Sequence, residues 1–451
     1  MKPYSGKERI YQEPYEPELR NLKFLFGIYA FFIISSIVMP QYFGIHLGYD
    51  ITCVRFVNML FIIYMCANPK ILTHFIQTTL RCEIFYPLCL YLAVAGYTMV
   101  LRVNINAFFL VFFEIFSLFM MVYGIRYVVG YKRTIKWIIG CAYFLCGYGL
   151  VEFACGKSLF VQFLKTMPAD VVSTYRSGYY RIMGPCGHAL GYGLVLLLFI
   201  AIACIDLDKN TIYVFKHPIL MALIFINVFL TGSRSTLGIA VLELILLIIF
   251  STREDTAKSL YYLGMAIVCF IAFLLLFYST GVGQYLMGQI TSVMDEFLDT
   301  DYAAKFGVQT ERLKNSGEYR KALPKIFKLD WLNPLVGRGK SFGGAEIDGI
   351  YIHSIDNYYV LQYIKYAYPG LVAYCLFMLV LLVDLIRRIM QKVSEVSAVT
   401  KAVFIGVVVY FVNLWWVDAL QTLKYVYIVI AIFYAARFEE QDRKAKSSEV
   451  T

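Results

Sequence analysis

Apolar residues follow one another along this chain in long runs that are separated by short polar breaks. Each run has about the length, roughly 20 residues, that a helix needs to cross a ~30 Å hydrocarbon layer. In lipid, a helix satisfies its backbone hydrogen bonds within the segment itself. We therefore predict an all-α polytopic integral membrane protein with about twelve transmembrane helices, at 24–42, 51–68, 84–101, 105–125, 135–154, 185–205, 217–232, 235–251, 260–280, 357–386, 401–416 and 419–436.

Two polar stretches, 155–184 and 281–356, are longer than the other breaks. A structureless loop as long as the second is unusual in a compact protein, so we predict a large, partly helical outer loop. Short helices are expected in it at 283–299 and 309–328, before a glycine-rich NPLVGRGKSFGG segment. The chain then divides into an N-terminal tail, nine helices, the loop subdomain, three helices and a C-terminal tail, at 1–23, 24–280, 281–356, 357–436 and 437–451.

Lysine and arginine gather in the two tails and in alternate short loops. The loop residues are Lys70, Arg81, Arg126, Lys132, Arg133, Lys136, Lys209, Lys216, Arg253, Lys258, Arg387, Arg388, Lys392 and Lys401. Positively charged loops stay in the cytoplasm. We therefore predict a cytoplasmic (inner) membrane protein with both termini in the cytoplasm and with loop 281–356 outside the cell membrane.

The composition agrees with a polytopic membrane protein and excludes several function classes. Hydrophobic residues make up 60% of the chain and charged residues 16%, against about a quarter charged in soluble domains. The net charge of +10 is spread over many loops, so no nucleic-acid partner is expected. The 11 cysteines lie mostly in apolar runs without metal-binding spacing, and no P-loop is present. We therefore expect no metal and no cofactor.

Two arginines stand out near the predicted outer ends of helices. Arg181 lies in YRIMGPCGH, with Arg176 and His188 close by in the sequence. It could equally be an interfacial arginine that reaches lipid phosphate. Arg234 lies in TGSR, between two short apolar runs, where a near-membrane arginine is costly and indicates a functional site. A helix that begins there would offer backbone N–H groups to an anion.

Later polar residues could complete such a site. The end of the outer loop carries Arg312, Lys314, Arg320, Arg338 and Lys340, although such charges usually form a solvated face. In HSIDN, His353 and Asp356 are three residues apart, so they would share one face of a helix and could accept a proton from a hydroxyl. Asp356 could equally cap the following helix.

Arginine pairs bidentately with phosphate or diphosphate. The residues therefore predict a membrane enzyme that holds a lipid-linked diphosphate as leaving group while a base deprotonates an attacking hydroxyl.

These motifs, in this order, resemble those of the O-antigen ligase and Wzy-type O-antigen polymerase family of bacterial polysaccharide assembly. The resemblance covers roughly residues 175–385 and rests on Arg181 before GPCGH, Arg234 in TGSR, Arg312 before NPLVGRG, and DNYYVLQYIKYAYPGL. It implies metal-independent, inverting glycosyl transfer at the outer face of the membrane. The donor and acceptor would be oligosaccharides linked to undecaprenyl diphosphate, and a flippase and a chain-length regulator would be candidate partners.

The resemblance also assigns roles. Arg181 and Arg234 would bind the diphosphate, and His353 or Asp356 would orient or deprotonate the acceptor hydroxyl; we predict that His353 touches it. The other expected substrate-binding residues are Arg312, Arg338, Lys340, His188, Asn357 and Arg176.

The sequence departs from the family pattern at one position, and two alternative functions remain. Ligases have His-Asn where this chain has Asp356-Asn357, which favours a polymerase. An O-antigen ligase would differ only in its acceptor. A polysaccharide transporter or flippase is the alternative from another class, and the mid-helix acids Glu114 and Glu243 are the features in its favour.

Overall fold

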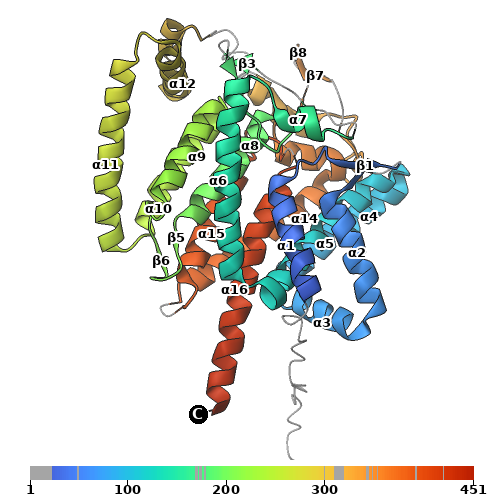
Figure 1. The fold of residues 1–451 in the computed structure, drawn as a ribbon. Coiled ribbons are helices and arrows are strands. Elements are labelled where there is room, and N and C mark those ends of the chain that lie inside the picture. Colours follow the sequence, from blue (N-terminus) through green and yellow to red (C-terminus); the bar gives the residue numbers. More distant parts are fainter. Residues whose placement is uncertain are drawn as a thin grey trace, which may run out of the picture.

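The computed structural model of the chain is built mainly from helices (Figure 1). It describes residues 23–47, 50–167, 171, 175–176, 179–298, 300–308, 319–341, 345–347, 349–352, 354–391, 394–419 and 421–450. The helices are α1 (Lys23–Val38), α2 (Cys53–Ala67), α3 (Pro69–Leu80), α4 (Phe85–Arg102), α5 (Ile105–Gly124), α6 (Tyr131–Cys155), α7 (Leu159–Leu164), α8 (Ala189–Ala203), α9 (Pro218–Leu230), α10 (Arg234–Ile249), α11 (Arg253–Leu276), α12 (Gly281–Leu298), α14 (Tyr358–Ile389), α15 (Ser397–Asn413) and α16 (Leu423–Val450).

Shorter elements join these helices. A π-helical turn, η2 (Ile125–Val129), continues α5, and two 3₁₀ segments, η3 (Tyr302–Phe306) and η4 (Leu323–Lys328), lie in the outer segment. The strands form four antiparallel hairpins, which are β1 (Gly44–His46) with β2 (Asp50–Thr52), β3 (Tyr175–Arg176) with β4 (Tyr179–Tyr180), β5 (Ile205–Asp206) with β6 (Thr211–Ile212), and β7 (Ala345–Ile347) with β8 (Ile350–Ile352).

Each of the twelve predicted spans overlaps one of these helices. By length and apolar composition, five of the described helical segments could cross a membrane, namely 85–102, 105–129, 131–155, 253–276 and 358–389. A multi-pass, mostly helical membrane protein is thus supported, whereas the number of twelve spans stays a prediction.

The sequence analysis missed α3. This helix begins at Pro69, bends by 117° from α2, and would make a sixth span if the bent pair counts as one. Asn68 precedes the proline, and its side-chain amide donates to the Tyr64 carbonyl. The buried face of α3 carries His74 and Phe75, while the rest of the helix is largely exposed, as expected of an amphipathic segment.

The core of the bundle lies around α8 and α16, with α15 packed against both, α5 against α16, and α14 against α15. All but one residue of α8 is buried, as is the whole stretch 425–438 of α16. A helix that is apolar on every side must be surrounded by other helices. In contrast, only 6% of the apolar stretch of α11 is buried, and this helix stands at the edge of the bundle (Figure 1).

The two ends of the bundle differ. The C-terminus of α16 and the start of α1 lie at one end, whereas α7, β3, β7, β8 and α12 gather at the other (Figure 1). Near the C-terminal end, Arg437 of α16 pairs with Glu83 and Asp384, and Asp442 pairs with Arg126. These buried and half-buried ion pairs fix α16 to α14 and to the α3–α4 turn.

The described residues of segment 281–356 include α12, η3, η4, β7 and β8, whereas its position as a loop outside the membrane stays a prediction. The expected helix at 283–299 is α12. The second expected helix, at 309–328, falls partly outside the described residues, and its described part ends in η4.

We expect single cysteines at Lys258 and Lys305, in a cysteine-free background, to react from opposite sides of the membrane. Lys258 lies near the start of α11 and Lys305 in η3, beyond α12, and both are exposed. An impermeant thiol reagent on intact cells should label position 305 and leave position 258 unlabelled until the membrane is opened. Labelling of position 305 only from the cytoplasm would contradict the predicted orientation.

Candidate functional site

The TGSR turn joins α9 to α10 and places Arg234 at the first position of α10. Gly232 has a φ of +60°, which a residue with a side chain rarely adopts. Ser233 then caps α10, because its hydroxyl accepts a hydrogen bond from the Thr236 N–H at 3.3 Å. The side chain of Arg234 is 8% exposed. The sequence thus produces a tight turn that presents a buried arginine at a helix start.

Arg181 lies directly against this turn. Its Nε donates a 2.7 Å hydrogen bond to the Thr231 carbonyl. A Cβ added at Gly232 would lie 3.2 Å from the same Nε, so the two segments are in close contact. Burial lowers the pKa of Arg181 to about 10, and the positive charge of Arg234 acts in the same direction. Two guanidinium groups are therefore held near each other, an arrangement that an anion would stabilise.

Glu152, near the end of α6, holds the loop that carries Arg181. This fully buried carboxylate accepts hydrogen bonds from the Tyr180 hydroxyl at 2.9 Å, the Met183 N–H at 3.1 Å and the Gly184 N–H at 2.9 Å. These bonds fix the backbone on both sides of Arg181. Sequence reasoning missed Glu152. An acid inside the apolar run 135–154 was the signal, because such a residue needs buried partners.

His188 lies just before α8 and is its N-cap. Its Nδ1 accepts a 3.1 Å hydrogen bond from the Leu190 N–H, so the ring proton of the neutral imidazole is on Nε2. Burial and the charge of Arg181 lower the pKa of His188 to about 4, although Asp356 opposes this. At neutral pH, His188 is therefore an uncharged hydrogen-bond donor through Nε2, and it lies close to both Arg181 and Asp356.

This state of His188 predicts a loss of stability in acid. The pKa is about 4 in the folded protein and about 6.5 when unfolded, so protonation favours unfolding as the pH falls through this range. Between about pH 7 and pH 5 the loss is about 2 kcal/mol. His188→Asn should keep the helix cap but remove most of this sensitivity. Thermal unfolding of both proteins at the two pH values measures it, and an equal acid shift in the variant would contradict the assignment.

Asp356 lies in the segment that precedes α14. The Ser354 hydroxyl donates to its Oδ1 at 2.7 Å, and the Ser354 N–H donates to the Tyr319 hydroxyl at 3.0 Å. Burial raises the pKa of Tyr319 to about 12, and the negative charge of Asp356 adds to this, so the phenol stays protonated. Asp356 is therefore hydrogen-bonded to Ser354 and interacts electrostatically with His188 and Tyr319.

The alternative role of Asp356 as a helix cap is wrong. Asn357 caps α14, because its Oδ1 accepts the Val360 N–H at 3.1 Å. Asn357 is also 2% exposed. Its side-chain oxygen is thus used within the fold, which argues against its expected role in binding substrate and leaves Asp356 available for chemistry.

The NPLVGRG segment explains where Arg338 lies. The α14 helix breaks at Ala367, whose φ is 55°, and the N–H groups of Arg338 and Gly339 donate to the freed carbonyls of Ile364 and Lys365, each at 2.9 Å. The Arg338 guanidinium carbon lies 5.1 Å from the centre of the Trp331 ring. Arg338 and the exposed Lys340 thus belong to a loop that is docked on the break in α14.

On its other side, this loop is held by the α4–α5 turn. The Arg102 side chain donates to the Gly337 carbonyl at 2.8 Å and to the Val336 carbonyl at 3.1 Å. A Cβ at Gly337 would lie 2.1 Å from the Lys365 carbonyl oxygen, so only glycine fits there. Arg102 is a second residue that sequence reasoning missed.

The remaining predicted residues are only partly accounted for. His353 and Arg312 lie outside the described residues. The backbone of Arg176 belongs to β3, which pairs with β4 just before Arg181. The predicted residues that the structure brings together are therefore Arg181, Arg234, His188 and Asp356.

The α12 helix packs against α10 and against the turn at Gly232. The Tyr285 hydroxyl donates to the Phe229 carbonyl at 3.1 Å, and a Cβ added at Gly232 would lie 3.4 Å from its oxygen. Further along α12, Asp295 accepts hydrogen bonds from Thr300 and from the N–H groups of Tyr302 and Ala303. Although burial opposes it, these bonds and the charge of Arg234 hold the pKa of Asp295 below its usual value. Asp295 thus interacts electrostatically with Arg234.

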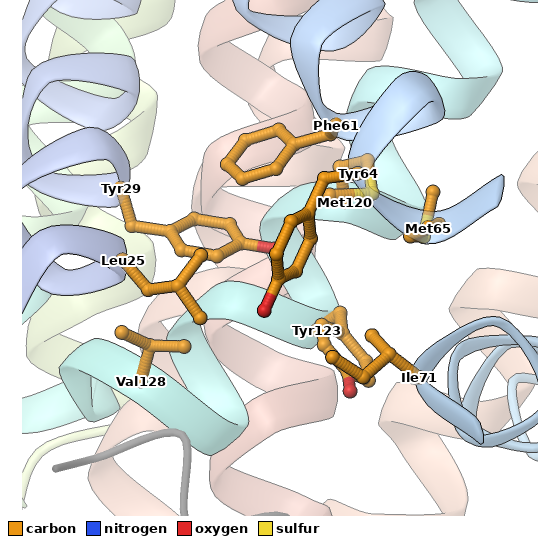
Figure 2. Close-up of a pocket in the computed structure, with 9 residues that line it drawn as sticks. All are labelled: Leu25, Tyr29, Phe61, Tyr64, Met65, Ile71, Met120, Tyr123 and Val128. Carbon is orange, nitrogen blue, oxygen red and sulfur yellow. The ribbon is translucent and has the colours of Figure 1, made fainter. Parts of the chain in front are cut away.

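Within the described ranges, no group of three or more His, Cys, Asp or Glu side chains could hold a metal ion. The best-formed cavity lies elsewhere, between α1, α2, α3, α5 and η2, and is small and lined by apolar and tyrosine side chains (Figure 2). It contains none of the predicted site residues. No model of a known protein family matches this chain, and no curated protein matches it.

Proposed function

We propose that the protein is a polysaccharide polymerase that joins repeat units linked to undecaprenyl diphosphate by metal-independent, inverting glycosyl transfer at the outer face of the cytoplasmic membrane. The observation that carries this proposal is that Arg181 packs against the turn that leads into Arg234, and that Arg181 interacts electrostatically with Arg234 and His188, and His188 with Asp356. The chain also has helices long and apolar enough to cross a membrane, as expected of a protein that acts on a lipid-linked substrate.

The diphosphate would bind between the arginines. The Nε of Arg181 is used by the Thr231 carbonyl, and within the described part of the chain no hydrogen bond engages its two terminal nitrogens, which suits a phosphate group. A diphosphate would relieve the repulsion between the two guanidinium groups. It would also replace Asp295 as the anion that faces Arg234. Because charge on the diphosphate grows as it leaves, these contacts strengthen in the transition state.

The attack would come from a hydroxyl of the acceptor glycan. Its oxygen forms a bond to the anomeric carbon of the donor, and the bond from that carbon to the diphosphate oxygen breaks, so undecaprenyl diphosphate leaves with the electron pair. The hydroxyl proton passes to a carboxylate or an imidazole. Among the described residues we assign this role to Asp356, because Nδ1 of His188 already accepts the Leu190 N–H. His353 remains the candidate that sequence reasoning favoured.

The test is an assay with purified protein in liposomes and defined undecaprenyl-diphosphate repeat units. A ladder of products that differ by one repeat unit is expected. The same protein is offered a lipid A core acceptor in parallel. Transfer to that acceptor without a ladder would indicate a ligase, and the absence of any transfer by folded protein would contradict the proposal.

A further inference from the structure

The α11 helix runs beside α9 at the edge of the bundle (Figure 1). Aromatic rings join the two sides at two levels. The rings of Phe215, just before α9, and Tyr262 of α11 have centres 5.8 Å apart. The rings of Phe229, near the end of α9, and Phe270 of α11 have centres 5.7 Å apart. Along α11 these two contacts are roughly 12 Å apart, given the rise of a helix.

Between these contacts, the face of α11 that points to the bundle is not covered. This face carries the buried Ser259 and the partly buried Leu263 and Phe270. Ala266 and Ile267 lie on the same face, within one turn of Leu263 and Phe270. Nevertheless, Ala266 is exposed and Ile267 is 49% exposed. The middle of α11 is therefore separated from the bundle, although its ends are in contact with it.

The facing side of α9 is open in the same way. Ala222 lies seven residues before Phe229 and so shares its face of the helix, with Ile226 between them. Phe229 is partly buried, whereas Ala222 is exposed and Ile226 is 46% exposed. Two exposed apolar faces thus lie opposite each other. The space between them is called the α9–α11 slot below.

Contacts at both ends limit how a ligand can reach the slot. At the start of α11, the Thr256 hydroxyl donates a 3.2 Å hydrogen bond to the Ile248 carbonyl of α10. At the other end, the Tyr285 hydroxyl of α12 donates to the Phe229 carbonyl at 3.1 Å. The slot is therefore entered from the side of the bundle, which is the side that faces lipid if α11 spans the membrane.

The walls of the slot are apolar, whereas its end at Phe229 adjoins the two arginines. Neither α9 nor the part of α11 after Ser259 carries a charged residue. Such walls favour a hydrocarbon chain. The chain of the protein then continues from Phe229 through Thr231, whose carbonyl accepts the Arg181 Nε–H, to Arg234. A ligand that matches both parts has an anionic head and a long apolar tail.

We propose that the α9–α11 slot binds the polyprenyl chain of the lipid-linked donor. This inference rests on the proposed function for the diphosphate head at the arginines, whereas binding of the chain in the slot can be tested alone. The donor would enter sideways from the membrane, so that its chain lies between α9 and α11 while its diphosphate reaches the α9–α10 turn.

The binding test uses undecaprenyl diphosphate with a diazirine in its chain and the purified full-length protein in nanodiscs. Light should attach this probe mainly to residues that line the slot, which peptide mass spectrometry identifies. Phosphatidylglycerol with a diazirine in its acyl chain serves as the comparison. It has one phosphate rather than two for the arginines, so it should label the slot roughly 10-fold less at equal concentration. Equal labelling would show that any membrane lipid fills the slot and would overturn the inference.

Three tryptophan variants define the place of binding. Ala222→Trp fills the slot from α9 and should lower labelling by roughly 10-fold or more, because the probe must then displace a bulky side chain. Ala266→Trp fills it from α11 and keeps the test valid if the first variant misfolds. Ala272→Trp is the matched control, because Ala272 is an exposed alanine on the opposite face of α11. Undiminished labelling in a folded Ala222→Trp or Ala266→Trp would contradict the inference.

Kinetics separate this inference from the proposed function. In a polymerase assay, Ala222→Trp should raise KM for the donor, whereas Ala272→Trp should leave it unchanged. A wild-type protein that polymerises while folded Ala222→Trp keeps the donor KM contradicts the inference alone. A wild-type protein that binds the undecaprenyl probe in the slot but never forms polymer contradicts the proposed function alone.

Discussion

Arg234→Ala is expected to abolish visible polymer while the protein remains folded in the membrane. The loss of one charge-assisted contact to a leaving diphosphate corresponds to about 2–4 kcal/mol, or a rate drop of roughly 30- to 1000-fold. Folding should tolerate the change, because Arg234 lies beside the positive Arg181 and its removal relieves that repulsion. Turnover of undecaprenyl-diphosphate repeat units by purified variants, corrected for the folded fraction, gives the measurement.

Two variants define the origin of the effect. Arg234→Lys should recover little activity, since an ammonium group cannot reproduce the bidentate guanidinium. Arg253→Ala is the matched control, because Arg253 is also the first residue of a helix behind a side-chain cap, but it is exposed and belongs to α11. Normal polymer from Arg234→Ala, or an equal loss in Arg253→Ala, would remove Arg234 from the diphosphate site.

The helices could be predicted because apolar runs of membrane length leave few alternatives. The predicted span 84–101, for example, agrees with α4 (Phe85–Arg102). The break in α14 could not be predicted in this way. Pro369 was visible, but the pattern of apolar residues is the same for a straight and a broken helix. The break is stabilised by the N–H groups of Arg338 and Gly339, which lie about 30 residues away along the chain. The hydropathy pattern gives no information on such distant hydrogen-bond partners.

The same distinction applies to the site. Arg181 and Arg234 could be identified from the sequence because an arginine near the membrane is energetically costly and therefore indicates a functional site. Arg181 Nε donates to the Thr231 carbonyl in the turn that leads into Arg234, whereas the prediction that the two arginines act together stays a prediction. The role of Glu152 was hidden, because its three donors lie about 30 residues later in a loop whose backbone path the sequence does not reveal. The sequence left a helix-capping role for Asp356 open as an alternative, because Asp and Asn cap equally well and the pattern does not show at which residue the helix begins.

Asp356→Asn is expected to lower turnover by roughly 100-fold or more, the usual contribution of a general base. The amide keeps the size of the side chain but cannot take a proton from the acceptor hydroxyl. Stability should change little, because Asn357 rather than Asp356 caps α14. The exposed Asp330 of the outer segment offers the control, and Asp330→Asn should be fully active. Rates are compared at saturating donor and acceptor, so that binding effects do not enter.

His353→Ala completes this test, because sequence reasoning assigned the acceptor hydroxyl to His353. On that assignment the variant is inactive yet folded, and Asp356→Asn retains part of its turnover. If His353→Ala were fully active and Asp356→Asn were inactive but folded, Asp356 alone would be the residue that accepts the proton of the acceptor hydroxyl. In that case the neutral His188, which donates through Nε2, would orient the Asp356 carboxylate and Arg181 would hold the departing diphosphate. Full activity in both variants would contradict base catalysis by this segment altogether.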